Sequence, residues 1–361
     1  MINESEIEVM SLKDTTRWAQ ILTTLSKYDV YHLPEYHALA ETCDEGEAIL
    51  FVYRDSDCTV AFPLLLRNIE ISLGDSGADQ WRDATSVYGY PGPIMKGSMT
   101  ERSRNGFQSA LNQFLLDQHI VAVFSRLNPL LHQTKILTGY GQTQQVGTTL
   151  SIDLTLTEIE QLARYRKGHR YDIKRLIKSG YDCCEANDCE LEDFITIYTQ
   201  TMSRVDATPY YFFSKQYFDG LLHDMSGSVK LFTCKHDGII ACAALFSLCG
   251  CIVQYHLAGT REEYLQMAPM KLLLDYVRQW GIQQGAHTFH LGGGVGGEND
   301  SLFSFKRGFT DREHKFSVWK HIVSPDVYDL LYNYKCNQTG IFPEDTYFPS
   351  YRNPAFTKKL L

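Results

Sequence analysis

Apolar and polar residues alternate along the chain in short blocks, and the spacing within each block predicts helices or strands. Apolar runs of strand length, such as Glu47–Tyr53 (EAILFVY) and Cys58–Leu66 (CTVAFPLLL), are joined by tight polar turns such as Asp55–Asp57. Stripes at helical spacing occur elsewhere, and one begins after Pro269, a residue that the first turn of a helix tolerates. The pattern predicts strands at 47–53, 58–66, 120–124, 181–185, 229–234, 239–248, 251–257 and 287–291, and helices at 103–117, 157–179, 192–202, 214–225 and 269–285.

The two halves of the chain follow the same order of predicted elements. Each contains an apolar hairpin, an aromatic and glycine segment, a helix and a strand, and Tyr88–Pro93 in the first half corresponds to Tyr255–Thr260 in the second. This order suggests an internal duplication, and 361 residues exceed what one hydrophobic core usually organises. We therefore expect an α/β (α+β) protein with domains at residues 1–150 and 151–335, followed by an irregular tail at 336–361.

Composition supports a globular protein, and charge adds one local feature. Apolar residues make up 44% and charged residues 21%, which excludes a disordered chain or a disulfide scaffold. The net charge of −9 argues against a protein that coats nucleic acid or anionic membrane by bulk charge. Residues 164–178 nevertheless hold seven Lys or Arg and one acid, a concentration that suits contacts to phosphate or nucleic acid. The alternative is a solvated helix face.

The cysteines and histidines predict no metal site. The ten cysteines form no CxxC pair, and the twelve histidines form no HExxH and no zinc-type spacing. We interpret the cysteines as reduced, mostly structural thiols of a cytoplasmic protein. The acidic start of the sequence does not read as a secretory signal, and the longest uncharged run, 238–260, favours paired strands over a transmembrane segment.

Two neighbouring segments near residue 300 could carry chemistry. Gly292, Gly294 and Gly297 have the GxGxxG spacing of dinucleotide-binding loops, but no βαβ unit follows, so a glycine turn that allows close backbone approach is favoured. Lys306 stands between aromatic residues in Phe305–Phe309 (FKRGF). Such a lysine is either a desolvated cation that stabilises a developing oxyanion or a surface residue whose stem packs on the rings.

Several blocks of the sequence, taken in order, resemble the Fem family of peptidoglycan-bridge aminoacyltransferases within the GNAT N-acetyltransferase superfamily. The resemblance extends over roughly residues 30 to 320 and is most specific where the glycine segment leads into FKRGF. The resembling blocks are 164–180, 198–204, 210–214, 217–218, 255–259, 268–269, 289–294 and 305–309, with 88–93 and 126–129 in the first half.

The resemblance implies two tandem GNAT-like domains, each a mixed, largely antiparallel sheet flanked by helices. It implies an acyltransferase that forms an amide bond, moving an aminoacyl or acyl group from an activated donor, with aminoacyl-tRNA favoured, to an amine of a cell-envelope or polysaccharide precursor. The alternatives are an acyl-coenzyme A-dependent N-acyltransferase acting on an amino sugar and a non-catalytic module that binds a glycan or precursor. We expect no tightly bound cofactor, no metal, no DNA partner and at most transient contact with a membrane-linked precursor.

The resemblance also assigns roles to residues. Lys306 matches the family lysine that assists at the acyl ester, and His256 is a candidate base. The segment Arg261–Met270 lacks the glycine loop with which coenzyme A enzymes cradle pyrophosphate and carries two acids, which speaks against coenzyme A binding in the usual manner. The candidate substrate-binding residues are Phe305, Tyr255, Arg204, Tyr210, Tyr211, Gly292, Gly293, Gly294, Tyr88 and Tyr90, and the candidate phosphate- or donor-binding residues are Arg166, Lys167 and Arg170.

Overall fold

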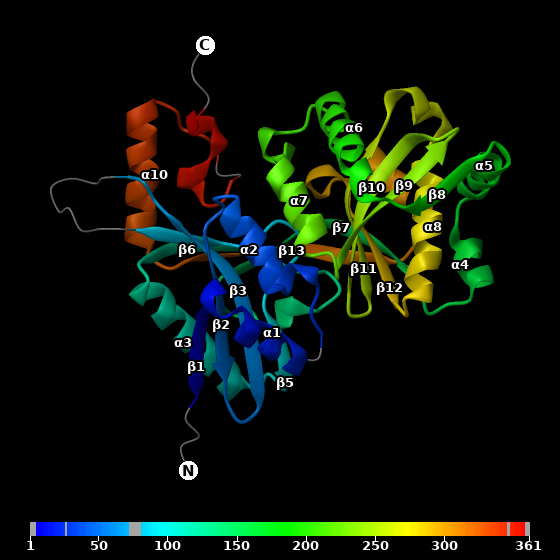
Figure 1. The fold of residues 1–361 in the computed structure, drawn as a ribbon. Helices are drawn as coiled ribbons and strands as arrows, with labels where there is room; N and C mark the ends of the chain where they lie inside the picture. Colours follow the sequence, from blue (N-terminus) through cyan, green and yellow to red (C-terminus); the bar gives the residue numbers. More distant parts are fainter. Residues whose placement is uncertain (1–4, 26, 72–80, 345–346, 358–361) are drawn as a thin grey trace. The chain divides into compact units, whose positions relative to one another are not determined.

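The computed structural model describes residues 5–25, 27–71, 81–344 and 347–357, and the chain divides into two compact units (Figure 1). The first unit consists of residues 1–146 and 316–361, and the second of residues 147–315. Each unit contains a mixed sheet with helices packed on it. Among the described residues, no helix is both long and apolar enough to cross a membrane.

The sheet of the first unit has the strand order β1-β2-β3-β4-β6-β13, with β5 paired to β3. The neighbouring strands are antiparallel except β4 and β6, which are parallel. The strands are β1 (Glu6–Ser11), β2 (Glu47–Arg54), β3 (Cys58–Asn68), β4 (Arg82–Thr85), β5 (Ile94–Gly97), β6 (Ile120–Arg126) and β13 (Glu313–Ile322), and the helices are α1 (Thr15–Thr24), α2 (Pro34–Thr42), α3 (Glu101–Asp117) and α10 (Pro325–Thr339).

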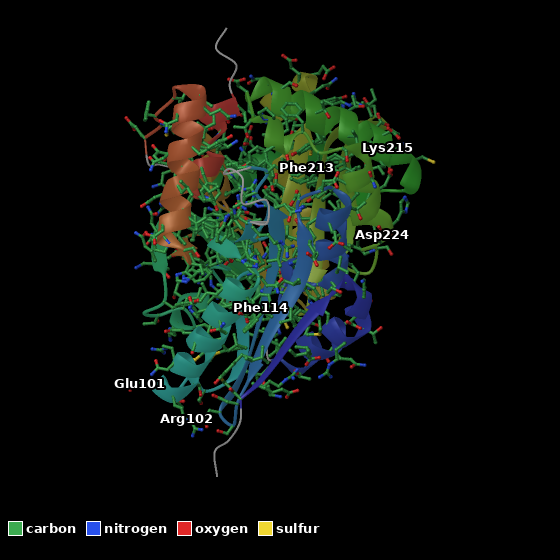
Figure 2. All side chains as sticks on the ribbon, turned by 90° about the vertical axis from the view of Figure 1, so that its left-hand side faces the viewer. Glu101, Arg102, Phe114, Phe213, Lys215 and Asp224 are labelled. Carbon is green, nitrogen blue, oxygen red and sulfur yellow. The ribbon has the colours of Figure 1, made fainter. Side chains whose placement is uncertain are left out.

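Strand β2 shows why the apolar runs of the first unit are continuous. Successive residues of a strand point to opposite faces, and in β2 both faces are buried, one with residues of α3 and the other with residues of α1. Ile49, Phe51 and Tyr53 lie on the α3 side, and Leu50 and Val52 lie on the α1 side. Helix α3 begins at Glu101, directly after Thr100, whose hydroxyl caps it by accepting from the N–H of Ser103 (Figure 2).

The sheet of the second unit has the order β7-β12-β11-β10-β9-β8. Its neighbouring strands are antiparallel except β11 and β12, which are parallel. The strands are β7 (Gln142–Asp153), β8 (Tyr181–Glu185), β9 (Val229–His236), β10 (Ile239–Cys249), β11 (Ile252–Thr260) and β12 (Thr288–Gly292), and the helices are α4 (Glu158–Arg164), α5 (Lys167–Lys178), α6 (Leu191–Arg204), α7 (Lys215–His223), α8 (Met270–Gln283) and α9 (Ser301–Lys306).

The two sheets repeat one topology, as the predicted duplication requires. In each, four antiparallel strands are followed by a parallel neighbour and then by an antiparallel one. The last strand is exchanged between the repeats, because β7 follows β6 in the chain but pairs with β12, and β13 follows β12 but pairs with β6. The predicted fold class, α/β with two repeated domains of mixed, largely antiparallel sheets flanked by helices, is therefore confirmed.

This exchange changes the predicted domain limits. The expected division after residue 150 lies close to the observed one after residue 146, but the chain from residue 316 onward, which we placed in the second domain and the tail, belongs to the first unit. Trp319 of β13 is buried in the core of that unit. The predicted irregular tail, 336–361, begins inside α10, and its Tyr351 is buried beside Leu331 of α10. Strand pairing of distant segments is what moves the boundary.

The predicted helix at 157–179 is interrupted in the structure. Helix α4 ends at Arg164 and α5 begins at Lys167, because Tyr165 and Arg166 adopt extended backbone angles. The hydroxyl of the buried Tyr165 donates to Asp275 at 3.0 Å, and the backbone N–H of Arg166 donates to the carbonyl of Gly308 at 2.8 Å. The bond to Gly308 replaces the helical bond of the Arg166 N–H, and the bond to Asp275 anchors the Tyr165 side chain.

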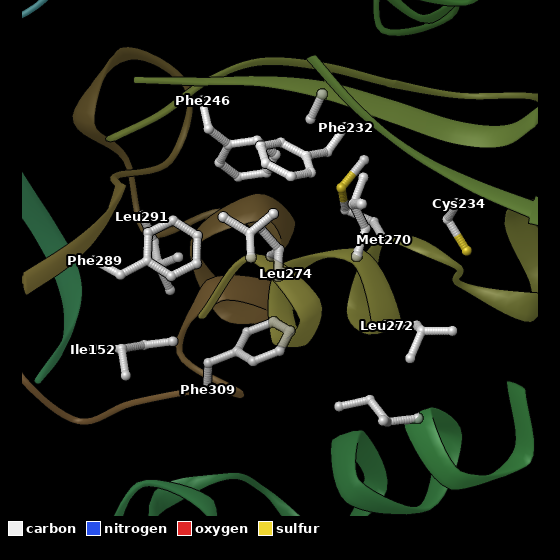
Figure 3. Packing of buried hydrophobic residues seen from close by; sticks show 14 of the residues in the cluster. Ile152, Phe232, Cys234, Phe246, Met270, Leu272, Leu274, Phe289, Leu291 and Phe309 are labelled. Atoms are coloured by element: carbon white, nitrogen blue, oxygen red, sulfur yellow. The ribbon is translucent and has the colours of Figure 1, made fainter. Parts of the chain in front are cut away.

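The core of the second unit lies between the sheet and helix α8 (Figure 3). Leu274 and Met270 from α8 pack with Phe232 and Phe246 from the sheet and with Phe289 from β12. Burial of such side chains contributes about 1.5–3 kcal/mol each. The core thus holds β12 and the segment that follows it, where Lys306 lies.

Candidate active site

Lys306 is the last residue of α9 and is 7% exposed. Its Nζ donates a hydrogen bond to the carbonyl oxygen of Gly293 at 2.7 Å and lies 5.5 Å from the centre of the Tyr255 ring. Burial lowers the pKa of Lys306 to about 7, although the charge of Asp300 acts in the opposite direction. Lys306 is therefore desolvated and is not a surface residue, while its predicted role as a cation that stabilises an oxyanion stays a prediction.

Lys306 and Tyr255 lie where two parallel strands separate. β11 and β12 pair from Ile252–Thr288 to Gln254–His290. Beyond that point β11 continues to Thr260, whereas β12 ends at Gly292, where a φ of 74° turns the chain. Tyr255 is the first residue of β11 past the last of these pairs. This divergence places a cation and an aromatic ring beside strand backbone that β12 does not pair.

The glycines after β12 are explained by close backbone approach. A Cβ on Gly293 would lie 2.7 Å from the carbonyl oxygen of Thr148, and a Cβ on Gly294 would lie 2.1 Å from that of Glu298. The turn is held by Asp300, whose carboxylate accepts from the N–H of Val295 at 3.1 Å. The sequence interpretation of this segment as a glycine turn agrees with the structure, while substrate binding by Gly292, Gly293 and Gly294 stays a prediction.

The aromatic residues of the FKRGF block pack on a histidine from the basic helix. Nε2 of His169 donates to the carbonyl oxygen of Phe305 at 2.9 Å, and its ring lies 4.7 Å from that of Phe309. Phe309 is fully buried. The ring that contacts Nζ of Lys306 is therefore that of Tyr255, and the aromatic residues that flank Lys306 in sequence form the support of α9.

Gly308 makes the contact with His169 possible, and Gly308→Ala tests it. A Cβ at this position would lie 2.1 Å from Nε2 of His169, so the ring must shift and lose its hydrogen bond to Phe305. We expect unfolding free energy to fall by about 1–3 kcal/mol, measured by urea denaturation. The matched control is Gly168→Ala in α5, where nothing lies within 4 Å of the added Cβ. It should stabilise by about 0.5–1 kcal/mol, and equal effects of the two variants would contradict the packing argument.

A bulge in the pairing of β10 with β11 lies at His256, because Phe246 stands opposite Tyr255 and Leu245 stands opposite Leu257. Nε2 of His256 is 3.3 Å from the hydroxyl of Tyr217, which belongs to α7. Burial lowers the pKa of His256 to about 4, so its imidazole is neutral at pH 7 but only weakly basic. Tyr255 thus packs against the core that contains α8, whereas His256 contacts α7, and a role of His256 as a base stays a prediction.

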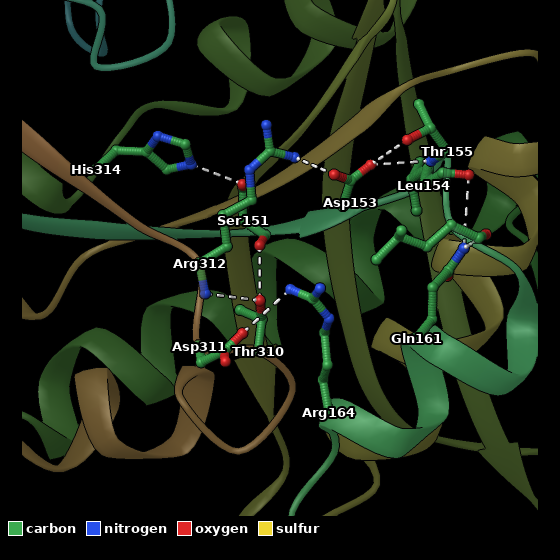
Figure 4. A network of polar contacts seen from close by, with 11 residues as sticks. Ser151, Asp153, Leu154, Thr155, Gln161, Arg164, Thr310, Asp311, Arg312 and His314 are labelled. Carbon is green, nitrogen blue, oxygen red and sulfur yellow. Dashed lines mark hydrogen bonds and ion pairs between the residues drawn. The ribbon is translucent and has the colours of Figure 1, made fainter.

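A buried polar group beside Lys306 was missed from the sequence. Nδ1 of the fully buried His290 donates to Oε1 of Gln254 at 2.7 Å, and the His290 ring lies 6.4 Å from that of His314. Nε2 of His314 lies 2.7 Å from Oγ of Ser151 (Figure 4). Burial, together with His314 and the charge of Lys306, holds the pKa of His290 well below its usual range. The available signal was a histidine inside the apolar strand 287–291.

An aromatic cluster joins the predicted acceptor residues to His256. Tyr210, which is 46% exposed, packs edge-on against Tyr211 and Phe213. Phe213 lies just before α7 (Figure 2), and its ring stacks on that of Tyr217 in α7, with 4.3 Å between the ring centres. Arg204, at the end of α6, donates to the carbonyl oxygen of Thr260 at 3.3 Å, where β11 ends. Arg204, Tyr210 and Tyr211 therefore all belong to the α6–α7 side of the second unit.

The predicted phosphate-binding residues are divided by the structure. Arg166 lines an open groove of about 600 Å³ together with Arg164 and Arg307. Arg164 is paired with Asp311 at 3.2 Å (Figure 4). Lys167 and Arg170 are exposed on α5 and do not line this groove.

Tyr88 and Tyr90 belong to the first unit. The ring of Tyr90 packs edge-on against Tyr31 at 5.7 Å and against Phe316 at 5.2 Å. A Cβ on the intervening Gly89 would lie 2.1 Å from the Tyr31 ring, which explains that glycine. Substrate binding by Tyr88 and Tyr90 stays a prediction.

The junction between β11 and α8 offers no backbone cradle for pyrophosphate. Pro269 stands directly before α8 and has no N–H. The N–H of Lys271 donates to the carbonyl of Ala268, and the N–H groups of Leu272 and Leu273 donate to that of Pro269. Three of the amides that could bind an anion at this helix start are thus already bonded. Among the described residues, no group of three or more His, Cys, Asp or Glu could hold a metal ion.

Comparison with known proteins gives a family match within the second unit. Residues 163–307 match the model of the acetyltransferase (GNAT) domain. In fold the chain is similar to the crystal structure of FemX, with 12% identity, coverage of 90% of this chain and 99% of that chain, and a TM-score of 0.69. It is also similar to L-PGS from Bacillus licheniformis, with 15% identity, coverage of 85% and 92%, and a TM-score of 0.53.

A further similar structure is the C-terminal domain of a putative lysylphosphatidylglycerol synthetase from Agrobacterium fabrum, with 14% identity, coverage of 85% and 90%, and a TM-score of 0.51. At these identities the likeness concerns the fold. The comparison with curated proteins gives no match. The resemblance to Fem-type proteins of the GNAT superfamily is thereby confirmed at the level of the fold.

Proposed function

Because residues 163–307 match the model of the acetyltransferase (GNAT) domain, we propose that the protein joins an aminoacyl or acyl group to an amine, with Lys306 as the group that stabilises the oxyanion formed in the reaction. The observation that supports this is the position of Nζ of Lys306. It is buried, bonded to the carbonyl of Gly293 and next to Tyr255, where β11 and β12 diverge. A cation at a desolvated point stabilises negative charge far better than it would in water.

The proposed reaction proceeds by addition and elimination. The acceptor amine attacks the carbonyl carbon of the donor ester or thioester, and the carbonyl oxygen becomes an oxyanion. The ammonium of Lys306 stabilises that oxyanion. When the carbon–oxygen double bond re-forms, the bond to the leaving group breaks, and the proton lost by the amine balances the charge on the released alkoxide or thiolate.

Two features favour aminoacyl-tRNA as the donor. The start of α8 has three of its amides already bonded and is preceded by the exposed Glu262 and Glu263, which disfavours the pyrophosphate of coenzyme A. Helix α5 and the residues before it carry seven basic side chains and one acidic side chain, which suits the phosphates of a nucleic acid. An acyl-coenzyme A donor is the second candidate, since the matched domain model is named for acetyl transfer.

For the acceptor we propose an amine on a cell-envelope or polysaccharide precursor. The supporting feature is the exposed aromatic surface at Tyr210, whose rings could pack against a sugar or an apolar chain. The proposed acceptor would approach from the α6–α7 side, where Arg204 and His256 lie. A module that binds such a precursor without turnover is the remaining alternative.

Direct titration separates the donors. We expect charged tRNA to bind with an affinity that falls steeply with salt, and coenzyme A to leave the thermal midpoint unchanged. Changing Arg166 and Lys167 to alanine together should lower the slope of log affinity against log salt by about 2, since each phosphate contact contributes about 1. Arg102→Ala, which changes an exposed residue of α3, is the control and should leave this slope unchanged. Stabilisation by coenzyme A but not by tRNA would select the second candidate.

A further inference from the structure

Three cysteines form a row across neighbouring strands of the second unit. Cys183 in β8 stands directly opposite Cys234 in β9, and Cys234 stands directly opposite Cys242 in β10. Residues directly opposite each other on antiparallel strands share a face and have Cβ atoms about 4.5–5.5 Å apart. All three are free thiols in the structure. We call Cys183, Cys234 and Cys242 the thiol row.

The members of the thiol row differ in exposure. Cys234 and Cys242 are fully buried in the core on the α8 side of the sheet, where Figure 3 shows Cys234. Cys183 is half-buried, and its strand β8 is the last strand in the sheet order. The next residue, Cys184, turns to the other face, where its Sγ lies 3.5 Å from Oγ1 of Thr233. Reagents in solution therefore reach the thiol row from the β8 side.

The position of each thiol in the row also affects its pKa. Cys234 has a thiol on each side, and hydrogen bonds from Cys183 and Cys242 lower the pKa of the Cys234 thiol. The pKa of Cys183 is raised, chiefly by its hydrogen bond to Cys234, and burial raises that of Cys242. The thiol row therefore holds a negative charge most favourably on the sulfur of Cys234.

We propose that Cys183 and Cys234 form a modification site that a hydroperoxide oxidises to a cross-strand disulfide. Opposite residues of antiparallel strands have Cα atoms about 4.5–5.5 Å apart, inside the range of about 4.4–6.8 Å that disulfides span. Disulfides hold the two Cβ atoms about 3.5–4.5 Å apart, so the bridge draws Cys183 and Cys234 slightly closer while β8 stays paired with β9. Opening of the last strand of a sheet is the kind of local fluctuation that admits a small oxidant to Cys234.

The chemistry balances with hydrogen peroxide as the oxidant. The Cys234 thiolate attacks one peroxide oxygen, giving a sulfenic acid and hydroxide, and the hydroxide takes up the proton that the thiol had lost. The Cys183 thiol then attacks the sulfenic sulfur and releases water. In sum, two thiols lose one hydrogen each, one sulfur–sulfur bond forms, and one peroxide becomes two waters.

Cys234 and Cys242 are a weaker pair for the bridge. Both are fully buried, and a register irregularity lies between Ile240 and Cys242 in the pairing of β9 with β10. Neither of these sulfurs is at the sheet edge. The proposal therefore names Cys183 as the partner of Cys234.

Peptide mapping of the full-length protein tests the proposal. The protein is treated with a small excess of hydrogen peroxide, unfolded, alkylated and digested. We expect a mass loss of two hydrogens, two fewer alkylated thiols, and one linked peptide pair containing Cys183 and Cys234, all reversed by dithiothreitol. Cys184→Ser, next in sequence but on the other face, should keep the bridge, and Cys183→Ser should abolish it.

Three results would overturn the proposal. One is a bridge between Cys234 and Cys242, and another is a bridge made by the exposed Cys189 or Cys251. The third is oxidation of Cys183 to a sulfinic acid with no linked peptide. Because the wild-type map already distinguishes these outcomes, the proposal does not depend on how well any variant folds.

Discussion

Replacing Lys306 with alanine is expected to lower kcat/KM for acyl transfer by about 10²–10³, the usual effect of removing one group that stabilises an oxyanion. The reason is positional, since Nζ is desolvated and held by the carbonyl of Gly293 beside Tyr255. The measurement is initial-rate kinetics with labelled aminoacyl-tRNA and precursor. Lys315→Ala, an exposed lysine of the same unit, is the control and should retain full activity. Unchanged turnover by the Lys306 variant would remove Lys306 from the mechanism.

The pH profile tells which form of Lys306 acts. Burial brings the pKa of Lys306 to about 7, so the ammonium is lost as pH rises through neutrality. If the ammonium stabilises the oxyanion, kcat/KM falls above pH 7, because this parameter reports groups of the free enzyme. The arginine in Lys306→Arg stays charged throughout this pH range, because arginine has a pKa above about 12. The fall in kcat/KM above pH 7 should therefore be absent from this variant. If kcat/KM instead rose as the pH passed 7, and this rise were absent from the arginine variant, Lys306 would be identified as a neutral base.

Replacing Asp275 with alanine is expected to reduce the unfolding free energy by about 3–5 kcal/mol, the range for breaking a buried ion pair. The partner is Arg278, whose side chain is 1% exposed and whose Nε donates to Asp275 at 2.9 Å. Arg278 also donates to Gln161 and Glu158, and the hydroxyl of Tyr165 donates to Asp275. Without Asp275, a guanidinium and a phenol would lose their buried acceptor.

A surface pair provides the matched control for Asp275. Asp193 pairs with Arg261 at 3.0 Å, but the Asp193 side chain is 53% exposed, so Asp193→Ala should cost less than about 1 kcal/mol. Chemical denaturation of both variants at one salt concentration gives the comparison. If Asp275→Ala cost no more than Asp193→Ala, the buried network would not be what holds α4 to α8.

Local patterns in the sequence predicted much of the fold. The apolar hairpins at β2–β3 and β9–β10 were predictable because each strand is buried on both faces and each turn is polar and tight. Other elements gave weaker signals: β1 lies at the end of its sheet and exposes Ile7 and Val9, and α2 is short. Helix 157–179 was predicted as continuous because helical spacing says nothing about the tertiary bonds of Tyr165 and Arg166.

Only part of the candidate site could be predicted from the sequence. Lys306 could be picked out by its FKRGF context, whereas His290 and His169 are single histidines whose importance depends on what lies opposite them. The bulge at His256, which decides what Tyr255 and His256 each contact, could not be predicted from strand alternation. That Tyr255 meets Lys306 could not be predicted either, because Lys306 lies 51 residues further along the chain.

The sequence by itself determined the α/β class, the duplication, the basic helix and the lysine after the glycine turn. Each of these features depends on short-range spacing and composition, which can be read without the tertiary structure. Only the tertiary structure decided that β7 and β13 exchange between the repeats, that Tyr255 is the ring beside Lys306, and that three cysteines stand in one row. These features depend on which distant strands pair and in what register. Register is set by packing across the whole sheet, and no local window of the sequence contains that information.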